Sequence, residues 1–162
     1  MIQRKQSIYL ALAFICVTLL LFFPIFNIEY SRLEETAKGT FGAYGMHFGE
    51  EGSSDFPLYV LFIVMALLTA AGILMYKDRK KQLMLCRLNL VFHVLIAFSL
   101  SVFFYLGKSM VEENLKAKGF GDISFSMDIG FFLLIASIPF LILAIRGIKQ
   151  DEQLLKSIDR IR

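Results

Sequence analysis

The sequence predicts an all-α membrane protein: a bundle of four transmembrane helices with a small β-like cap that two loops form on the extracytoplasmic side. Hydrophobic residues make up 57% of the chain, above the roughly 45–50% of soluble domains. They gather in four long apolar runs without Asp, Glu, Lys or Arg, each close to the ~20 residues that cross a bilayer core of about 30 Å. We therefore expect a single membrane domain over residues 1–162, with helices at about 7–26, 56–76, 83–106 and 129–148 and a cytoplasmic amphipathic tail at about 149–162.

A short basic hairpin, Lys77-Asp78-Arg79-Lys80-Lys81, separates the second apolar run from the third. Five residues leave room only for a tight turn, so the helices beside it are expected to be antiparallel neighbours. Four of the five residues are cations, and cytoplasmic loops are enriched in Lys and Arg. The hairpin is therefore expected in the cytoplasm. This assignment places both chain termini in the cytoplasm and the loops at 27–55 and 107–128 outside.

The distribution of charge along the chain agrees with this orientation. Two cations precede the first run, five lie at or just after the hairpin and five follow the fourth run, which is 12 of the 17 Lys and Arg. The outer loops hold the other five cations and ten of the 14 acidic residues. The net charge of +3 is therefore a topology signal and not a nucleic-acid footprint. The candidate contacts with lipid headgroups or a partner are Lys77, Arg79, Lys80, Lys81, Arg87, Arg146, Arg160 and Arg162.

The first apolar run, Ser7–Phe26, is expected to stay in place as a membrane anchor. It is too long for a signal peptide, and bulky residues at 23–26 occupy the place of a cleavage site. Pro24 is expected to close this helix, because the residue before a proline avoids helical backbone angles. Cys16 and Cys86 lie within or beside apolar runs and outside any CxxC pair, so both are predicted to be small buried side chains.

Two pieces of the outer loops alternate apolar and small or polar residues with a period of two. Tyr44–Phe48 does so in the first loop and Ile123–Met127 in the second, which is typical of short strands with one apolar face. We expect these two pieces to pair with each other and to cap the bundle; the alternative is a pair of unpaired loops. The second loop also begins with a helix-like piece, Lys108–Lys118.

The fourth helix is expected to carry a kink and an amphipathic extension. Pro139 lies inside its apolar run and removes one helical hydrogen bond. After Arg146, apolar residues recur at helical spacing between charged ones as far as Ile161. This pattern favours an amphipathic helix along the cytoplasmic membrane surface over a frayed polar tail.

A polar stripe lies on the third predicted helix. Asn89, His93 and Ser101 share one face with Ala97, because they are spaced by four or eight residues. His93 could be a haem ligand, a proton relay or a base for Ser101, but each role lacks a partner in the sequence. The apolar runs contain no acidic residue for a proton path, and residues eight apart lie roughly 12 Å apart along a helix.

We therefore favour packing of this polar stripe against another helix, with hydrogen bonds between the two. The small residues Ala66, Thr69, Ala70 and Gly72 of the second helix are the expected counterpart. Arg87, one turn inside the third helix, is expected to reach the inner headgroups. Its alternative partners are a lipid phosphate or the pair Asp151-Glu152. No residue is assigned as catalytic, cofactor-binding or metal-binding, and no cofactor is expected.

The two ends of the chain resemble a known family. Residues 1–10 read MIQRKQSIYL, residues 144–152 read AIRGIKQDE and residues 156–162 read KSIDRIR. These motifs are similar to the termini of a bacterial membrane-protein family, domain of unknown function 4293, although Lys5 departs from an apolar position. The resemblance implies four hydrophobic helices and a bacterial inner-membrane location. It implies no activity and no catalytic residue.

These features favour a non-enzymatic function. The expected role is a scaffold or small subunit of a membrane complex, whose partners are membrane lipids and other membrane proteins, without nucleic acid. One alternative is a membrane enzyme that acts on lipids or quinones, although a thiol oxidoreductase of this size would need cysteine pairs that the sequence lacks. Another alternative is a small-solute channel, in which Asn89, His93 and Ser101 would line a hydrated cavity.

Overall fold

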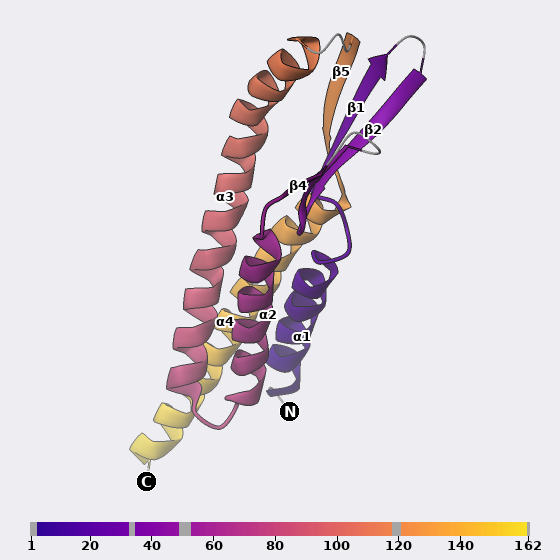
Figure 1. Ribbon diagram of the computed structural model, residues 1–162. Helices are drawn as coiled ribbons and strands as arrows, with labels where there is room; N and C mark the ends of the chain where they lie inside the picture. The colour runs from indigo at the N-terminus through magenta and orange to yellow at the C-terminus, as the bar shows by residue number, and fades with distance from the viewer. Residues whose placement is uncertain (1–2, 33–34, 49–52, 118–120, 162) are drawn as a thin grey trace.

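The computed structural model describes residues 3–32, 35–48, 53–117 and 121–161, which form four α-helices and five β-strands. The helices lie side by side, and the strands project beyond the ends of α1, α2 and α4, beside the last turns of α3 (Figure 1). This arrangement confirms the predicted combination of four helices with a β cap from two loops. In chain order the elements are α1 Gln3–Leu19, β1 Phe26–Arg32, β2 Glu35–Gly42, β3 Gly45–His47, β4 Ser53–Asp55, α2 Leu58–Leu74, α3 Arg79–Ala117, β5 Gly121–Met127 and α4 Ile129–Ile161.

The four helices form a ring in which each contacts two neighbours. α1 contacts α2 and α4, and α3 contacts the same two helices from the other side. The chain runs up, down, up and down, so both termini lie at the end opposite the sheet (Figure 1). This is the simplest topology of a four-helix bundle.

Buried residues of α1, α2 and α4 follow one spacing rule. They recur in alternating steps of three and four, an average of 3.5 residues, which is the period of left-handed knobs-into-holes packing. The buried face of α3 departs from this rule with two successive steps of four, from Asn89 to His93 and to Ala97. The narrow buried stripe leaves most of each helix surface outside the core. The stripe consists of Gln6, Leu10, Ala13, Val17 and Leu20 along α1 and the residue after it, Leu58, Phe62, Met65, Thr69 and Gly72 in α2, and Leu134, Ser137, Leu141, Ala144, Ile148 and Asp151 in α4.

The first helix is shorter than the predicted 7–26. α1 ends at Leu19, and Phe26 already belongs to β1. Pro24 has no N–H, and the N–H of Ile25 donates to the carbonyl of Phe41 in the sheet at 2.7 Å. The helix therefore ends several residues before the proline, and the last apolar residues of the run, Ile25 and Phe26, pack in the core beside Phe41 of the sheet.

The strands form one antiparallel sheet in the order β4-β3-β2-β1-β5. β5 pairs with β1, so that Met127 lies opposite Phe26, and β3 pairs with β2 and β4. The predicted direct pairing of Tyr44–Phe48 with Ile123–Met127 is therefore wrong, because β1 and β2 lie between them. β1 and β2 are close in the chain and pair along their whole length, and such a local pairing has a low loop-closure entropy.

The third and fourth helices are longer than predicted. α3 begins at Arg79 and continues to Ala117, so the predicted helix at 83–106 and the helix-like piece at 108–118 are one element of about 58 Å at 1.5 Å per residue. Its last turns pack on the sheet, where Val111 contacts the buried pair Ile28 and Tyr30. α4 continues through Pro139 and the predicted tail to Ile161.

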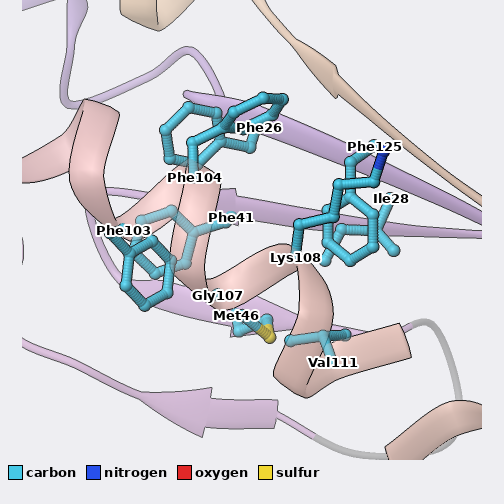
Figure 2. A pocket seen from close by; sticks show the side chains of 10 residues that line it. All are labelled: Phe26, Ile28, Phe41, Met46, Phe103, Phe104, Gly107, Lys108, Val111 and Phe125. Carbon is cyan, nitrogen blue, oxygen red and sulfur yellow. The ribbon is translucent and has the colours of Figure 1, made fainter. Parts of the chain in front are cut away.

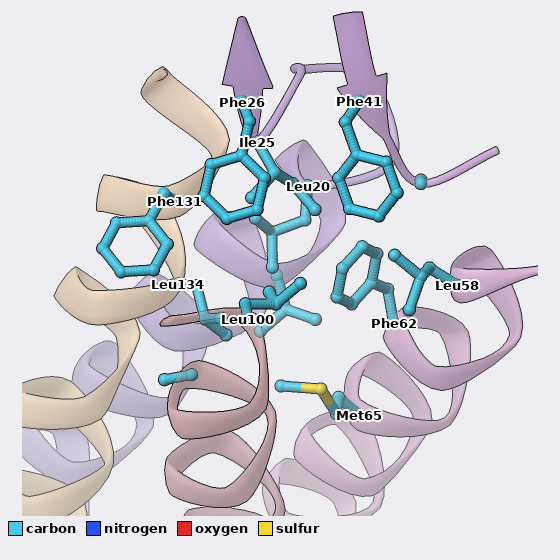
Figure 3. Packing of buried hydrophobic residues seen from close by; sticks show 13 residues of the cluster. Leu20, Ile25, Phe26, Phe41, Leu58, Phe62, Met65, Leu100, Phe131 and Leu134 are labelled. Atoms are coloured by element: carbon cyan, nitrogen blue, oxygen red, sulfur yellow. The ribbon is translucent and has the colours of Figure 1, made fainter. Parts of the chain in front are cut away.

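An aromatic cluster joins the sheet to the bundle (Figure 3). The ring of Phe26 in β1 lies 5.8 Å from that of Phe41 in β2 and 5.9 Å from that of Phe131 in α4. Phe104 of α3 is closer still, at 5.1 Å. Aromatic rings at such separations stabilise one another beyond the burial of their area. The sheet and the four helices therefore share one hydrophobic core.

Gly130 is required where α4 begins beneath this cluster. Its N–H donates to the carbonyl of Pro24 at 2.9 Å, and a Cβ at position 130 would lie 2.5 Å from that carbonyl oxygen. The atom in the way is backbone, so it cannot move aside as a side chain would. We expect Gly130→Ala to lower the free energy of unfolding by about 1–3 kcal/mol, measured by thermal or denaturant unfolding in detergent.

The matched control for Gly130 is Gly107, which lies inside α3. A Cβ there meets the ring of Phe103 at 3.6 Å, an ordinary contact. Gly107→Ala should leave stability unchanged or raise it by up to about 1 kcal/mol, because alanine favours the helix interior. Equal effects of the two substitutions would contradict the close approach of α4 to the α1–β1 turn.

Candidate functional site

A layer of buried polar side chains divides the bundle core in two. The apolar cluster nearer the sheet includes Val17 and Ala97, and the cluster nearer the termini includes Ala13 and Cys86. Between them along the chain lie polar residues from three helices, all at most 1% exposed. We call this set the polar layer: Thr69 of α2, Asn89 and His93 of α3, and Ser137 of α4.

Hydrogen bonds tie the polar layer to the helix backbones and link two helices. The amide Nδ2 of Asn89 donates to the hydroxyl of Thr69 at 2.7 Å, across the α2–α3 interface. Thr69 in turn donates to the carbonyl of Met65, and Ser137 donates to the carbonyl of Leu134. The ring Nδ1 of His93 lies 2.8 Å from the carbonyl oxygen of Asn89.

Two polar atoms of this layer have no hydrogen-bond partner among the described residues. They are Oδ1 of Asn89 and Nε2 of His93, both completely enclosed. Buried polar atoms without a partner are rare in folded proteins. These two atoms could each form a further hydrogen bond inside the bundle.

Ser101 takes no part in the polar layer, although it shares the helix face of Asn89 and His93. It is half-buried, and its hydroxyl donates to the carbonyl of Ala97 in its own helix at 2.8 Å. Of the small residues expected opposite the stripe, Thr69 accepts the hydrogen bond from Asn89. Gly72 lies beside Cys86, whose sulfur is 3.4 Å from the position of an added Cβ.

The end of the bundle near the chain termini is closed by a second polar group, which we call the terminal clasp: Gln6, Arg79 and Asp151. The amide of Gln6 in α1 donates to Asp151 of α4 at 2.5 Å, and the guanidinium of Arg79 in α3 lies 3.4 Å from the same carboxylate. The Asp151 side chain is 6% exposed. One carboxylate therefore fixes the ends of three helices.

The clasp bears on one alternative considered for Arg87, a pairing with Asp151. Arg79 holds Asp151, and Arg87 is exposed on α3, so its contact with lipid headgroups stays a prediction. Lys77, Lys80, Lys81 and Arg146 are exposed at the same end of the bundle. The side chain of Arg160 and the whole of Arg162 lie outside the residues that the structure describes.

Helix α3 begins at a charged cap in the hairpin. The carboxylate of Asp78 accepts the backbone N–H of Lys81 at 3.3 Å, and the ammonium of Lys81 lies 3.2 Å from it. The hydrogen bonds from Lys81, backbone first, lower the pKa of Asp78 below its usual value. The stabilisation is therefore present above the unfolded-state pKa and is lost as the pH falls through the lowered one.

Three cavities among the described residues lie near the sheet, and none is lined by a polar-layer residue. One lies between the sheet and α3 (Figure 2) and measures only about 10 Å³, so it is a packing gap. Another measures about 320 Å³ and lies where the turn after α1 meets β2 and β3. The largest of the three is open and apolar, measures about 460 Å³, and lies between α2, α3 and the sheet. Its walls are Phe41, Met46, Phe56, Leu58, Leu61, Ile96, Ser99, Leu100 and Phe103.

Comparison with protein families matches almost the whole chain to one of them. The model of the family described as "Domain of unknown function (DUF4293)" covers residues 2–161. The chain belongs to the DUF4293 family. No curated protein matches the sequence. In this DUF4293 chain, α3 and α4 are long and apolar enough to cross a membrane.

Sequence reasoning missed several buried polar residues of this DUF4293 chain. Gln6 and Gln82 each lie one residue before a predicted helix, at 7–26 and at 83–106. The amide of Gln82 donates to the carbonyl of Gly72 in the last turn of α2 at 2.9 Å. Ser137 was treated as part of an apolar run. Gln6, Ser137 and Asp151 all fall on the steps of three and four that mark the buried stripe, and this spacing could have identified them.

The clasp generates a stability prediction. Asp151→Ala removes the hydrogen-bond acceptor of Gln6 and the ion-pair partner of Arg79. The Arg79 side chain is only 21% exposed, so water cannot fully replace the lost contact. The substitution should lower the free energy of unfolding by roughly 1–3 kcal/mol. Unfolding of the purified protein in detergent measures it. The matched control is Lys81→Gln, which breaks the well-exposed pair with Asp78 and should cost under about 1 kcal/mol. A larger effect at Lys81 than at Asp151 would contradict the clasp.

Proposed function

We propose that this DUF4293 chain is a multi-pass protein of the bacterial inner membrane with both termini in the cytoplasm. We further propose that it acts as a non-enzymatic scaffold or small subunit of a membrane complex. The four helices would cross the bilayer, and the sheet with the last turns of α3 would form an extracytoplasmic cap.

The observation that carries the membrane proposal is the exposure of α3. Only 17% of its most apolar stretch is buried in the protein, whereas an apolar helix in the core of a soluble protein would be mostly buried. Val91, Leu95 and Phe98 on its outer side are all about half exposed or more. An exposed apolar surface of this extent is stable only against lipid or another protein.

Aromatic side chains support the position of the bilayer. Tyr59 and Tyr105 are exposed on α2 and α3 near the sheet, and Tyr76 is exposed at the opposite end of α2. Tyrosine is enriched at both membrane–water interfaces. The 17 residues of α2 rise about 26 Å, close to the hydrocarbon thickness of about 30 Å. The basic hairpin at the terminal end then supports a cytoplasmic assignment of that end.

The scaffold proposal is supported by how the bundle uses its polar side chains. The side chains of the polar layer and the clasp hold helices together, and Thr69 and Ser137 of the layer donate hydrogen bonds to backbone carbonyls of the helices. The described residues contain no group of three His, Cys, Asp or Glu that could bind a metal ion. The surfaces that remain for contact lie at the two ends. They are the sheet on one side and the cytoplasmic turns of α4, from Arg146 onward, on the other.

A second candidate is an interaction with a lipid or quinone, and the open apolar cavity between α2 and α3 favours it. Its volume of about 460 Å³ falls within the 300–1,000 Å³ typical of small-molecule sites. No observation favours a small-solute channel, because Asn89 and His93 are buried in the core and line none of the three described cavities.

The orientation can be tested by cysteine labelling. In a background with Cys16 and Cys86 replaced by Ser, we expect a membrane-impermeant maleimide to label Ser124→Cys in intact spheroplasts. Lys80→Cys should be labelled only after permeabilisation, because the hairpin is placed inside. Labelling of Lys80→Cys in intact spheroplasts, with Ser124→Cys protected, would invert the topology.

The scaffold proposal can be tested by photo-cross-linking in native membranes. A photoreactive amino acid is placed at Lys149 on α4, at Ser124 on the sheet and, as the lipid-facing control, at Leu95 on α3. We expect protein adducts at Lys149 or Ser124 and lipid adducts at Leu95. Absence of protein adducts at both end positions would contradict the scaffold, and a quinone or specific lipid recovered with the purified protein would favour the second candidate.

A further inference from the structure

The polar layer contains more hydrogen-bond acceptors than donors, and the protonation of His93 follows from its contacts. The atom nearest to Nδ1 is the carbonyl oxygen of Asn89, at 2.8 Å, and a carbonyl can only accept. Nδ1 must therefore carry a proton. In a neutral imidazole the other nitrogen is then an acceptor, so Nε2 presents a bare lone pair to the core.

Asn89 presents a second acceptor in the same layer. Its Nδ2 is committed to Thr69, whose own hydrogen is donated to Met65, so Oδ1 is the atom left without a partner among the described residues. Rotating the amide by half a turn does not remove the problem, because Nδ2 would then face the core unpaired. Asn89 and His93 are one turn apart on one helix face, so their side chains are neighbours.

We infer that the polar layer binds one enclosed water molecule, which donates one hydrogen to Nε2 of His93 and the other to Oδ1 of Asn89. Buried waters make about three hydrogen bonds to buried polar groups that otherwise lack partners. Two neutral acceptors without a matching donor require a ligand with two donors. Water is the smallest molecule of this kind.

The surroundings limit the ligand to this size. His93 is 0% exposed and Asn89 1% exposed, so no path is open for a haem or a quinone ring. Metal ions need further ligands, and no group of three His, Cys, Asp or Glu exists in the described chain. The next buried position after His93 on the same face of α3 carries a small side chain, Ala97.

The inference goes beyond the proposed function, because a bound water would be part of the bundle whether or not the protein has a partner. It also gives the layer a structural role. The hydrogen bond from Asn89 to Thr69 joins α2 to α3 in the middle of the bundle. A buried polar contact with all its partners can fix the register of neighbouring helices.

Nuclear magnetic resonance of histidine labelled with nitrogen-15 tests this site in the full-length protein in lipid bilayers. The chain has two histidines, and His47→Gln identifies the His93 signals. We expect a neutral ring with its proton on Nδ1, an Nε2 shift displaced in the direction of an accepted hydrogen bond, and magnetisation transfer to Nε2 from a slowly exchanging water. A proton on Nε2, an Nε2 without a hydrogen bond, or no transfer from water would each overturn the inference.

A pair of variants tests the second partner. Asn89→Leu removes Oδ1, so the water signal at Nε2 should be lost or strongly reduced, while Ser101→Ala, on the same helix but outside the layer, should leave it unchanged. A signal retained in Asn89→Leu would overturn the assignment of Asn89. The wild-type spectrum decides the presence of the water by itself, so the test still stands if Asn89→Leu does not fold.

Discussion

The bundle depends on one constraint: each helix buries only a narrow stripe of its surface, while much of the remaining surface in the middle of the bundle is also apolar. Exposed apolar surface of this extent is typical of proteins that contact a membrane or another protein. Charged side chains are consequently confined to the two ends, and the few polar side chains between them must be enclosed and hydrogen-bonded. The clasp at Asp151 meets this requirement. The polar layer meets it only in part, because Oδ1 of Asn89 and Nε2 of His93 lack partners among the described residues.

The sheet is bound to the bundle by apolar contacts and by backbone hydrogen bonds. Phe26 and Phe41 place two strands directly on the ends of the helices, and Gly130 allows α4 to begin against the carbonyl of Pro24. The last turns of α3 extend this contact along one face of the sheet. The cap and the bundle are therefore one folded unit, and a force on the sheet would be transmitted to the helices.

Much of this fold could be predicted from the sequence, because hydropathy determines where the helices lie. The four apolar runs and the helical tail at 149–161 are examples. The sheet topology could not be predicted, because strands as short as Gly45–His47 carry little pattern and pairing depends on distant partners. The predicted end of α1 is wrong for a related reason: apolar residues such as Ile25 and Phe26 are compatible with a buried strand as well as with a buried helix, so hydropathy does not distinguish the two. In the candidate site, Asn89 and His93 were identified, but Gln6 and Asp151 were not recognised as a pair, since 145 residues separate them.

The central claim, that lipid covers the outer surface of the bundle, is tested most directly by the collision of spin labels with relaxing agents. Labels at Leu95 on the outer face of α3, at Lys80 in the hairpin and at Ser124 in the sheet would be compared in reconstituted bilayers. The account predicts that the label at Leu95 collides mainly with oxygen, which concentrates in lipid, and the other two mainly with a water-soluble nickel complex. A label at Leu95 that is as accessible to the nickel complex as the one at Lys80 would contradict it.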